Sequence, residues 1–214
     1  MVDGGSSDGT VELLKEYGTR INQWVSERDG GIYDAMNKGV RMATGDWIGF
    51  LHADDLLAHS RIIADMLDVV VKTNADVVYG DLVYVQKDNS QQIVRYWKSE
   101  DFSLRLLPKG WMPPHPTVYV RRELFVKTGL FNVEYRISAD YDFLLRLLST
   151  PSIRIAYIPQ IMVRMRVGGA SNRSIGNIIR KSKEDYLALR RNHIGGIGAL
   201  LYKNLSKIGQ FFKR

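Results

Sequence analysis

The chain has 214 residues, of which 45% are hydrophobic and 25% charged, the balance of one folded domain rather than of a disordered segment. It contains no cysteine, which excludes disulfide frameworks, thiolate zinc sites and cysteine nucleophiles. The sequence has no apolar run near the roughly 20 residues that cross a bilayer, and it does not open on a secretory leader pattern. We therefore expect an intracellular globular protein.

The net charge of +7 is concentrated toward the C-terminus. Residues 173–214 carry ten Lys and Arg against only Glu184 and Asp185, whereas the other 172 residues hold twenty basic and twenty-one acidic side chains. A protein that binds nucleic acid usually carries its basic residues on the folded body. We therefore predict no nucleic-acid partner.

Hydrophobic patterns alternate between helix and strand along the chain. Helical patterns cover residues 11–17, 32–43, 60–72 and 139–148, and Ser138 is placed to cap the last helix. Strand patterns cover residues 21–26, 47–52, 77–86, 91–98, 117–120 and 153–158, with a hairpin loop at 87–90. This alternation predicts an α/β fold with a mostly parallel sheet flanked by helices.

The first polar cluster is residues 2–10, Val-Asp-Gly-Gly-Ser-Ser-Asp-Gly-Thr. Glycines let a backbone approach a ligand closely, and amides at a helix start favour phosphate. Asp3, at a strand end, can accept hydrogen bonds from a base or a ribose. The same residue types also form turns and helix caps, and taken alone the segment favours that plainer interpretation.

The second cluster, Phe-Leu-His-Ala-Asp-Asp at residues 50–55, ends an apolar strand with two adjacent acids. Ligands of α/β sheets bind at the carboxyl ends of strands. Asp54 and Asp55 would repel one another there unless a cation lies between them, and Mg²⁺ or Mn²⁺ take such oxygen ligands. A helix cap is the alternative, and the position directly after a buried strand favours the metal.

The third cluster lies in the helix pattern 139–148. Asp142 and Arg146 are four residues apart, the spacing of an ordinary helical ion pair. Asp140, in the first turn, points elsewhere and could serve as a dipole-favoured acid or as a general base. Spacing alone leaves both roles open.

Together these stretches resemble the family 2 glycosyltransferases, inverting enzymes of the GT-A fold. The resemblance also includes Ser-Glu-Arg-Asp-Gly-Gly-Ile-Tyr-Asp-Ala-Met-Asn-Lys-Gly at 26–39, Ala-Thr-Gly-Asp at 43–46, His-Pro-Thr-Val-Tyr-Val-Arg-Arg at 115–122 and Gly-Gly-Ala-Ser at 168–171. It extends from about residue 2 to 172, with the motifs in the family's order. The chain is most similar to the branch that builds bacterial surface polysaccharides.

The resemblance implies a nucleotide-sugar donor, a divalent cation (Mg or Mn) and a role for each matching residue. Asp140 would be the catalytic base and Asp55 the metal ligand. The donor would be bound by five residues: Asp3, Ser6, Asp34, Asn37 and Asp54. His115 lies between two prolines that fix its backbone, so it is a possible acceptor-side residue, although a lone histidine beside prolines is more often structural.

The sequence departs from the family pattern at Gly4, His52 and Ala139, each of which replaces a frequent acid. The strand, turn and helix that open family members are also missing, so we expect residues 1–193 to form a GT-A domain that is incomplete at its N-terminus. An inactive or regulatory remnant that binds nucleotide or a partner without turnover is therefore the alternative function.

Residues 194–214 are predicted to form a basic amphipathic tail. Apolar residues recur at helical spacing on one face (Ile197, Leu201, Leu205, Ile208, Phe212), and basic residues lie away from it (Lys203, Lys207, Lys213, Arg214). Such a helix suits an anionic membrane surface. We expect a cytoplasmic protein, peripheral at the inner face of the cell membrane, that acts on a glycan or lipid-linked acceptor. A helix packed back on the domain is the alternative.

Overall fold

The computed structural model describes residues 1–168 and 175–206. The strands are β1 (Val2–Asp3), β2 (Val25–Ser26), β3 (Trp47–Ile48), β4 (Leu56–Leu57), β5 (Val77–Val85), β6 (Ile93–Trp97), β7 (Tyr119–Arg121) and β8 (Ile155–Arg166). The α-helices are α1 (Thr10–Glu16), α2 (Ile32–Met42), α3 (Ile62–Thr73), α4 (Arg122–Thr128), α5 (Ala139–Leu148), α6 (Ile175–Arg191) and α7 (Ile197–Ser206). Three 3₁₀ turns complete them: η1 (Gly18–Arg20), η2 (Leu104–Lys109) and η3 (His115–Thr117).

A sheet of six strands lies at the centre, in the order β3-β7-β5-β8-β4, with β6 paired to β5 beside that path. Among its pairs β5 and β8 are parallel, and the other four are antiparallel. The α/β prediction is confirmed, but the expectation of a mostly parallel sheet is wrong, because the sheet is mixed. The chain turns back from β5 into β6 through a short hairpin, which needs no helical crossover and therefore gives an antiparallel pair.

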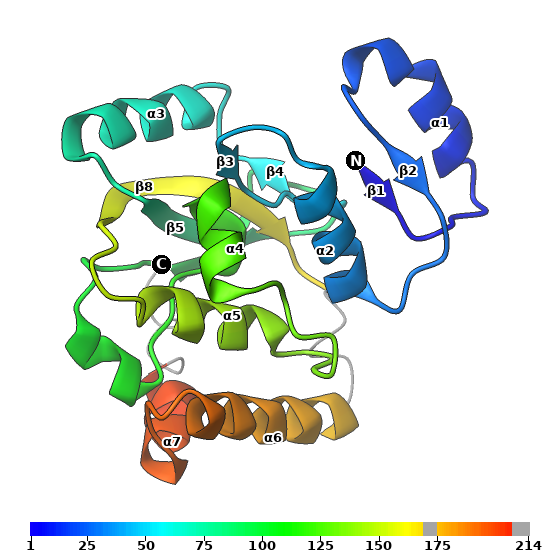
Figure 1. The fold of residues 1–214 in the computed structure, drawn as a ribbon. Helices are drawn as coiled ribbons and strands as arrows, with labels where there is room; N and C mark the ends of the chain where they lie inside the picture. Colours follow the sequence, from blue (N-terminus) through cyan, green and yellow to red (C-terminus); the bar gives the residue numbers. More distant parts are fainter. Residues whose placement is uncertain (169–174, 207–214) are drawn as a thin grey trace.

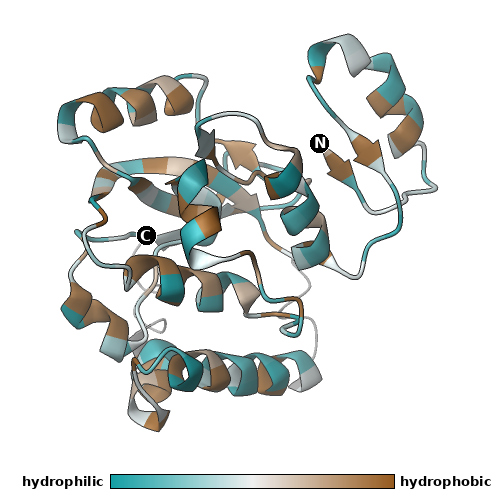
Figure 2. Ribbon diagram, in the orientation of Figure 1, coloured by the Kyte–Doolittle hydropathy of each residue, from teal (hydrophilic) through white to brown (hydrophobic). Residues whose placement is uncertain are grey.

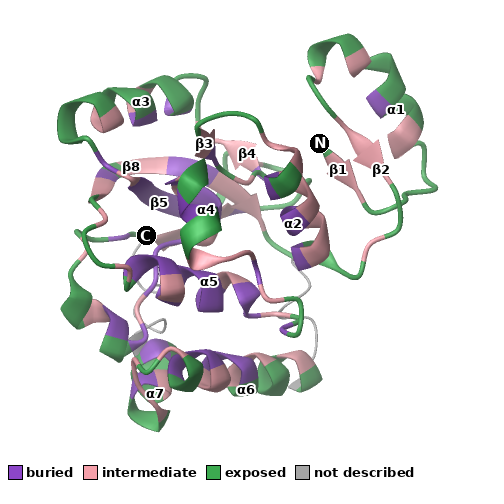
Figure 3. Cartoon of the chain, viewed as in Figure 1, coloured by how far each residue is buried: buried purple, intermediate pink, exposed green. Residues whose placement is uncertain are grey.

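Helices cover both faces of this sheet (Figure 1). Alternate residues of β5 point to opposite faces, so Val77 and Tyr79 join the core beneath α2, α4 and α5, whereas Val78 and Leu82 join the core beneath α3. All four side chains are fully buried. Figure 3 shows the same burial along β5 and α5. Burial on both faces makes β5 the centre of the molecule.

The N-terminal strands form a separate small sheet. β1 and β2 pair in parallel, Val2 with Val25 and Asp3 with Ser26, and lie beside α2 away from the central sheet (Figure 1). The strand predicted at residues 21–26 is reduced to its last two residues, because only Val25 and Ser26 find partners in the two-residue strand β1.

The tail helix α7 packs on the domain against α6 and η2. The sequence placed Lys203 on a solvated basic face, and that expectation is wrong. Lys203 is 3% exposed and forms an ion pair of 2.9 Å with Asp185 of α6. The opposite, apolar face points outward, with Ile197, Leu201 and Leu205 more than half exposed. The other tail residues named above (Lys207, Ile208, Phe212, Lys213, Arg214) lie outside the described residues, as do residues 169–171 of the Gly-Gly-Ala-Ser motif.

Candidate active site

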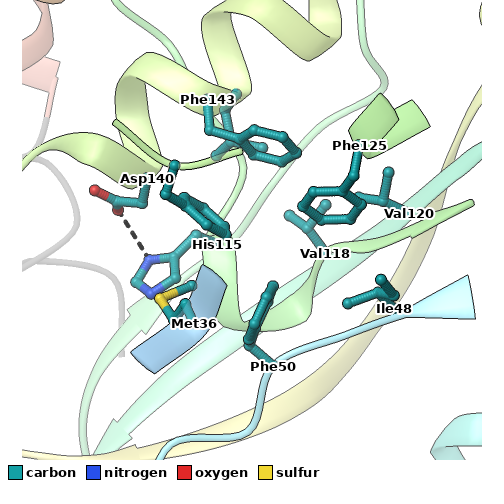
Figure 4. Close-up of a pocket in the computed structure, with 11 residues that line it drawn as sticks. Met36, Ile48, Phe50, His115, Val118, Val120, Phe125, Asp140 and Phe143 are labelled. Carbon is teal, nitrogen blue, oxygen red and sulfur yellow. Dashed lines mark ion pairs between the residues drawn. The ribbon is translucent and has the colours of Figure 1, made fainter. Parts of the chain in front are cut away.

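Asp140 lies in the first turn of α5 and is held from two other elements. The hydroxyl of Tyr33, from α2, donates to its Oδ1 at 2.9 Å. The Nδ1 atom of His115, from η3, lies 3.1 Å from its Oδ2, as Figure 4 shows. The side chain of Asp140 is only 15% exposed. Three segments far apart in the sequence therefore fix one carboxylate.

A second histidine extends this arrangement toward β3. The Nε2 atoms of His52 and His115 lie 3.1 Å apart, and the ring centroids are 5.4 Å apart. His52 follows β3 by four residues and precedes the acidic pair at 54 and 55. The contacts therefore run from the carboxylate of Asp140 through two imidazole rings to the loop that carries Asp55.

Opposing effects set the charge on these groups. Burial alone would raise the pKa of Asp140, but the charge and hydrogen bond of His115, together with the hydroxyl of Tyr33, hold it well below its ordinary value. Burial and the neighbouring His115 lower the pKa of His52 to about 4. At neutral pH Asp140 is therefore an anion and His52 is uncharged.

A small apolar pocket lies beside Asp140 and His115, which form part of its lining. Four phenylalanines from four segments belong to its wall: Phe50, Phe125, Phe131 and Phe143. Figure 4 labels Phe50, Phe125 and Phe143 among them. Phe125 and Phe143 stack with centroids 4.8 Å apart. This packed wall lowers the local dielectric around the carboxylate and strengthens its contacts.

Asp55 is the buried member of the acidic pair, 6% exposed, whereas Asp54 is exposed. The Oδ2 atom of Asp55 is buried and makes no hydrogen bond within the described residues. Burial raises the pKa of Asp55 to about 6, Asp54 adds to this, and His115 and Arg166 oppose it. A buried carboxylate oxygen without a partner fits a divalent cation.

The chain would supply only part of such a site. In residues 1–168 and 175–206 no three His, Asp or Glu side chains gather closely enough to hold a metal ion. Because Mg²⁺ and similar ions usually keep water and substrate phosphates as ligands, Asp55 and its neighbour would suffice only when a phosphorylated donor is bound.

Asp3 lies at the end of β1, as the sequence predicts, and its carboxylate organises the turn after it. It accepts hydrogen bonds from the amides of Gly5 and Ser6 and from the hydroxyl of Ser26. The Ser6 hydroxyl donates to the same carboxylate. The Ser26 and Ser6 contacts lower the pKa of Asp3 to about 2. Asp3 and Ser6 are thus brought together, on the small sheet beside α2.

Asp34 and Asn37 lie one turn apart on α2 but in different surroundings. Asp34 is partly exposed, accepts the amide of Gly30 and lies 3.6 Å from Lys38. Asn37 is 4% exposed, and its amide group both donates to and accepts from the backbone of Phe131. Asp34 therefore faces the surface, whereas Asn37 holds α2 against the loop before α5.

The start of α5 is stabilised by a residue that the sequence did not indicate. Ser138 occupies the cap position, but its side chain makes no capping hydrogen bond, so the predicted role of its hydroxyl is wrong. Instead Glu184 of α6, 8% exposed, accepts the amides of Arg136, Ile137 and Ser138 at 2.8–3.1 Å. The predicted ion pair of Asp142 with Arg146 is confirmed at 3.0 Å.

Sequence reasoning also missed Tyr33. Its neighbour Asp34 drew attention as a charged residue in the same motif, but the contact from Tyr33 to Asp140 spans 107 residues. Gly31 precedes α2 with a φ of 120°, a conformation that favours glycine, so it marks the start of the helix but not its partner. No local pattern indicates which residue a buried tyrosine will meet.

This mixed α/β sheet, with acids at strand ends and a held carboxylate at a helix start, defines a GT-A-type fold. The model of the family "Glycosyl transferase family 2" matches residues 1–129. The chain belongs to glycosyltransferase family 2.

Relatives agree with that assignment, and solved structures agree with the fold. A PGL/p-HBAD biosynthesis glycosyltransferase of Mycobacterium bovis is 32% identical over 177 residues, 80% of this chain and 66% of the relative. An uncharacterized glycosyltransferase of Rickettsia typhi is 26% identical, covering 100% of this chain and 70% of the relative. The fold resembles S. aureus TarS 1–349, with a TM-score of 0.65, 18% identity and coverage of 89% of this chain and 53% of that one. A structure of the same fragment with UDP-GlcNAc gives a TM-score of 0.64 at 16% identity, over 89% and 55% of the two chains.

Proposed function

We propose that the protein is an inverting glycosyltransferase that moves a sugar from a nucleotide-sugar donor to a glycan or lipid-linked acceptor in polysaccharide biosynthesis. The observation that carries this proposal is the carboxylate of Asp140, oriented by Tyr33 and His115 and linked through His52 to the loop of Asp55. A base and an acidic donor site joined by one chain of contacts suit a single displacement reaction.

In the proposed reaction Asp140 accepts the proton of the acceptor hydroxyl while that oxygen attacks the anomeric carbon of the sugar. The bond from this carbon to the nucleoside diphosphate breaks as the new bond forms on the opposite face, so the configuration inverts. Asp55, with Asp54 beside it, would hold Mg²⁺ or Mn²⁺, which when bound would neutralise charge on the diphosphate. Asp140 needs only to be ionised, and its lowered pKa favours that state.

The donor would extend from the acidic pair toward the small N-terminal sheet. We propose that Asp3 and Ser6 contact the base and ribose, that Asp34 and Asn37 lie beneath the donor, and that Asp54 contacts its phosphate end. Asp34 is accessible for this purpose, and Asn37 would act through the loop that it holds. UDP-sugars are reasonable first probes, because the TarS fragment was solved with UDP-GlcNAc.

Donor binding tests the metal assignment directly. Titration of the protein with UDP and Mn²⁺ is expected to show binding that chelation weakens at least about tenfold. Asp55→Asn should remove the Mn²⁺ dependence while leaving thermal stability nearly unchanged, since a neutral amide replaces a buried charge. Asp68→Asn, on the exposed side of α3, is the matched control and should bind like the wild type. Equal Mn²⁺ dependence in Asp55→Asn would contradict the assignment.

We also propose that α7 attaches the protein to the inner face of the cell membrane, as a cytoplasmic peripheral protein. In the described parts of the chain no helix is both long and apolar enough to cross a bilayer. The outward face of α7 presents Ile197, Leu201, Tyr202 and Leu205, each 51–66% exposed, and Figure 2 shows hydrophobic stretches on this helix. Apolar side chains on a helix in a basic segment suit an anionic lipid interface.

Flotation with vesicles of phosphatidylcholine and phosphatidylglycerol tests this attachment. Leu201→Asp should reduce the floating fraction severalfold, because it places a charge on the proposed buried face. Leu13→Asp on α1 is the matched control, since Leu13 is 56% and Leu201 57% exposed. If both variants float like the wild type, α7 is not the membrane contact.

A further inference from the structure

We propose that His115 and His52 act in sequence as positioning residues for the base: His115 fixes the carboxylate of Asp140, and His52 fixes the ring of His115. The inference rests on the proposed function, because it deepens the role of the same site. It assigns neither histidine to the acceptor or the metal.

Each oxygen of the Asp140 carboxylate has a hydrogen-bond partner. Tyr33 takes Oδ1 and His115 takes Oδ2, so neither oxygen can rotate away without breaking a contact. The Tyr33 hydroxyl is anchored in turn, since it also lies 2.6 Å from the carbonyl oxygen of Ile137 and shares its single proton between the two acceptors. One lone pair on each oxygen remains, and its direction is set by these two partners. Effective proton transfer requires that direction to be correct.

The backbone of His115 is held in place by its neighbours in η3. Its backbone belongs to η3, between Pro114 and Pro116, and the next residue, Thr117, is 0% exposed. The Thr117 hydroxyl lies 3.0 Å from the carbonyl of Gly80 and 2.8 Å from that of Pro114. Residue 115 is therefore tied to the central strand β5, so its ring has a fixed origin from which to reach Asp140.

The contacts of the two histidine rings determine which of their nitrogen atoms carry protons. The Nδ1 atom of His115 faces a carboxylate and therefore carries a proton. The two Nε2 atoms are 3.1 Å apart, a distance at which two bare lone pairs would repel, so a proton lies between them. The hydrogen bond fixes the plane of the His115 ring, which otherwise could turn about its side-chain bonds. His52 thereby supports the contact made by Nδ1.

Charged or titratable groups from three other elements act on Asp140. Tyr33 approaches from α2 and His115 from η3, and the ammonium of Lys203 acts on it from α7. Glu184 of α6 lies close enough to act on Tyr33. His115 supplies the largest of the effects that oppose burial, so its removal should raise the pKa of Asp140.

Steady-state release of UDP from UDP-GlcNAc and UDP-glucose with Mn²⁺ provides the assay. His115→Ala should lower kcat by about a hundredfold, the scale expected when a base is misplaced, with little change in the donor KM. His115→Asn, whose amide can occupy the place of Nδ1–H, should recover about tenfold. His52→Ala should lower kcat less, and His52→Gln should restore it, because its amide can reach the position of Nε2.

The pH profile separates positioning from packing. With donor and Mn²⁺ at saturation, where bound metal would keep Asp55 ionised, the acid limb of kcat reports Asp140. That limb should move to higher pH in His115→Ala and stay in place in His59→Ala. His59 is an exposed histidine near the same loop and serves as the matched control. A lower kcat with an unmoved acid limb and no recovery in His115→Asn would overturn the proposal.

A spectroscopic measurement keeps the inference independent of turnover. ¹⁵N NMR of histidine-labelled protein should show His115 with a proton on Nδ1, in a signal that shifts in Asp140→Asn and in His52→Ala. If wild-type protein releases no UDP, the proposed function fails, and this signal still decides the geometry. The inference is overturned, whatever the activity, if Nδ1 of His115 carries no proton or if its signal shifts in neither variant.

Discussion

At the scale of single residues, the ion pair of Lys203 with Asp185 shows how the tail is joined to the domain. Both side chains are 3% exposed, and the Lys203 ammonium also lies over the ring of Tyr141, the residue after Asp140. Burial lowers the pKa of Lys203 to about 8, although Asp185 opposes the shift. A buried pair of this kind costs desolvation energy that its own attraction only partly offsets.

Removing one partner should therefore be worse than removing both. Lys203→Met is expected to lower the free energy of unfolding by about 3 kcal/mol, because it leaves the Asp185 charge buried and unpaired. The double variant Lys203→Met with Asp185→Leu should recover most of that loss. Urea unfolding measures both, and Glu134→Gln, which breaks an exposed pair with Arg191, should change stability by less than about 1 kcal/mol. A double variant as unstable as the single one would contradict this account.

Residues whose chemistry follows from local sequence were predictable. Asp3 ends a strand, Asp140 opens a helix, and the Asp142–Arg146 pair obeys helical spacing, as predicted. The prediction that Asp55 directly follows a strand is wrong, because β3 ends at Ile48 and Asp55 instead precedes β4. The roles of Asp3, Asp55 and Asp140 stay predictions. The contacts of Tyr33 and His52 were not predictable, because their partners lie 107 and 63 residues away along the chain. Lys203 was placed on the wrong side because a helical wheel separates two faces but does not say which one the domain covers.

At the scale of elements, helix α5 depends on α6 for its N-terminal stabilisation. Glu184 receives three backbone amides from residues 136–138, where orphan N–H groups would otherwise be buried. Its negative charge also lies at the positive end of the α5 dipole. The first turn that carries Asp140 is thus fixed by a residue 44 positions later in the sequence.

Glu184→Ala should lower the free energy of unfolding by about 3 kcal/mol, since it leaves three backbone amides without the charged acceptor they had. Glu184→Gln, which keeps one acceptor oxygen, should lose less. The matched control is Glu123→Ala, an exposed acid in the first turn of α4, which should change stability by no more than about 0.5 kcal/mol. Chemical unfolding of the three variants tests this, and equal losses for Glu184→Ala and Glu123→Ala would refute the capping role.

Sequence patterns missed the helices α4 and α6, but the bounds of the helices that were predicted match the structure better than those of several strands. The helix predicted at 139–148 has those bounds, because its apolar spacing is strong and continuous. The strand predicted at 47–52 is only Trp47–Ile48, since an edge strand lacks a second partner to extend its pairing. The strand predicted at 153–158 is, by contrast, longer than expected. It forms β8 and continues to Arg166, because every residue of β5 pairs with it.

At the scale of the whole molecule, one side of the central sheet carries the chemistry. Helices α2 and α5 and the turn η3 all lie in the larger core on that side, and each brings a residue to the same carboxylate. Helix α3 covers the other side and α7 closes the lower end beneath α5 (Figure 1). The sheet order that achieves this could not be predicted, because it depends on long-range pairings rather than on local patterns.

The most direct test of the central claim compares wild-type protein with Asp140→Asn in UDP-sugar turnover and in UDP binding. If Asp140 is the base, turnover should fall by at least about a hundredfold in Asp140→Asn while UDP binding with Mn²⁺ stays within about threefold. Near-normal turnover by Asp140→Asn would contradict the account, as would a wild-type protein that binds UDP but never turns over a sugar donor.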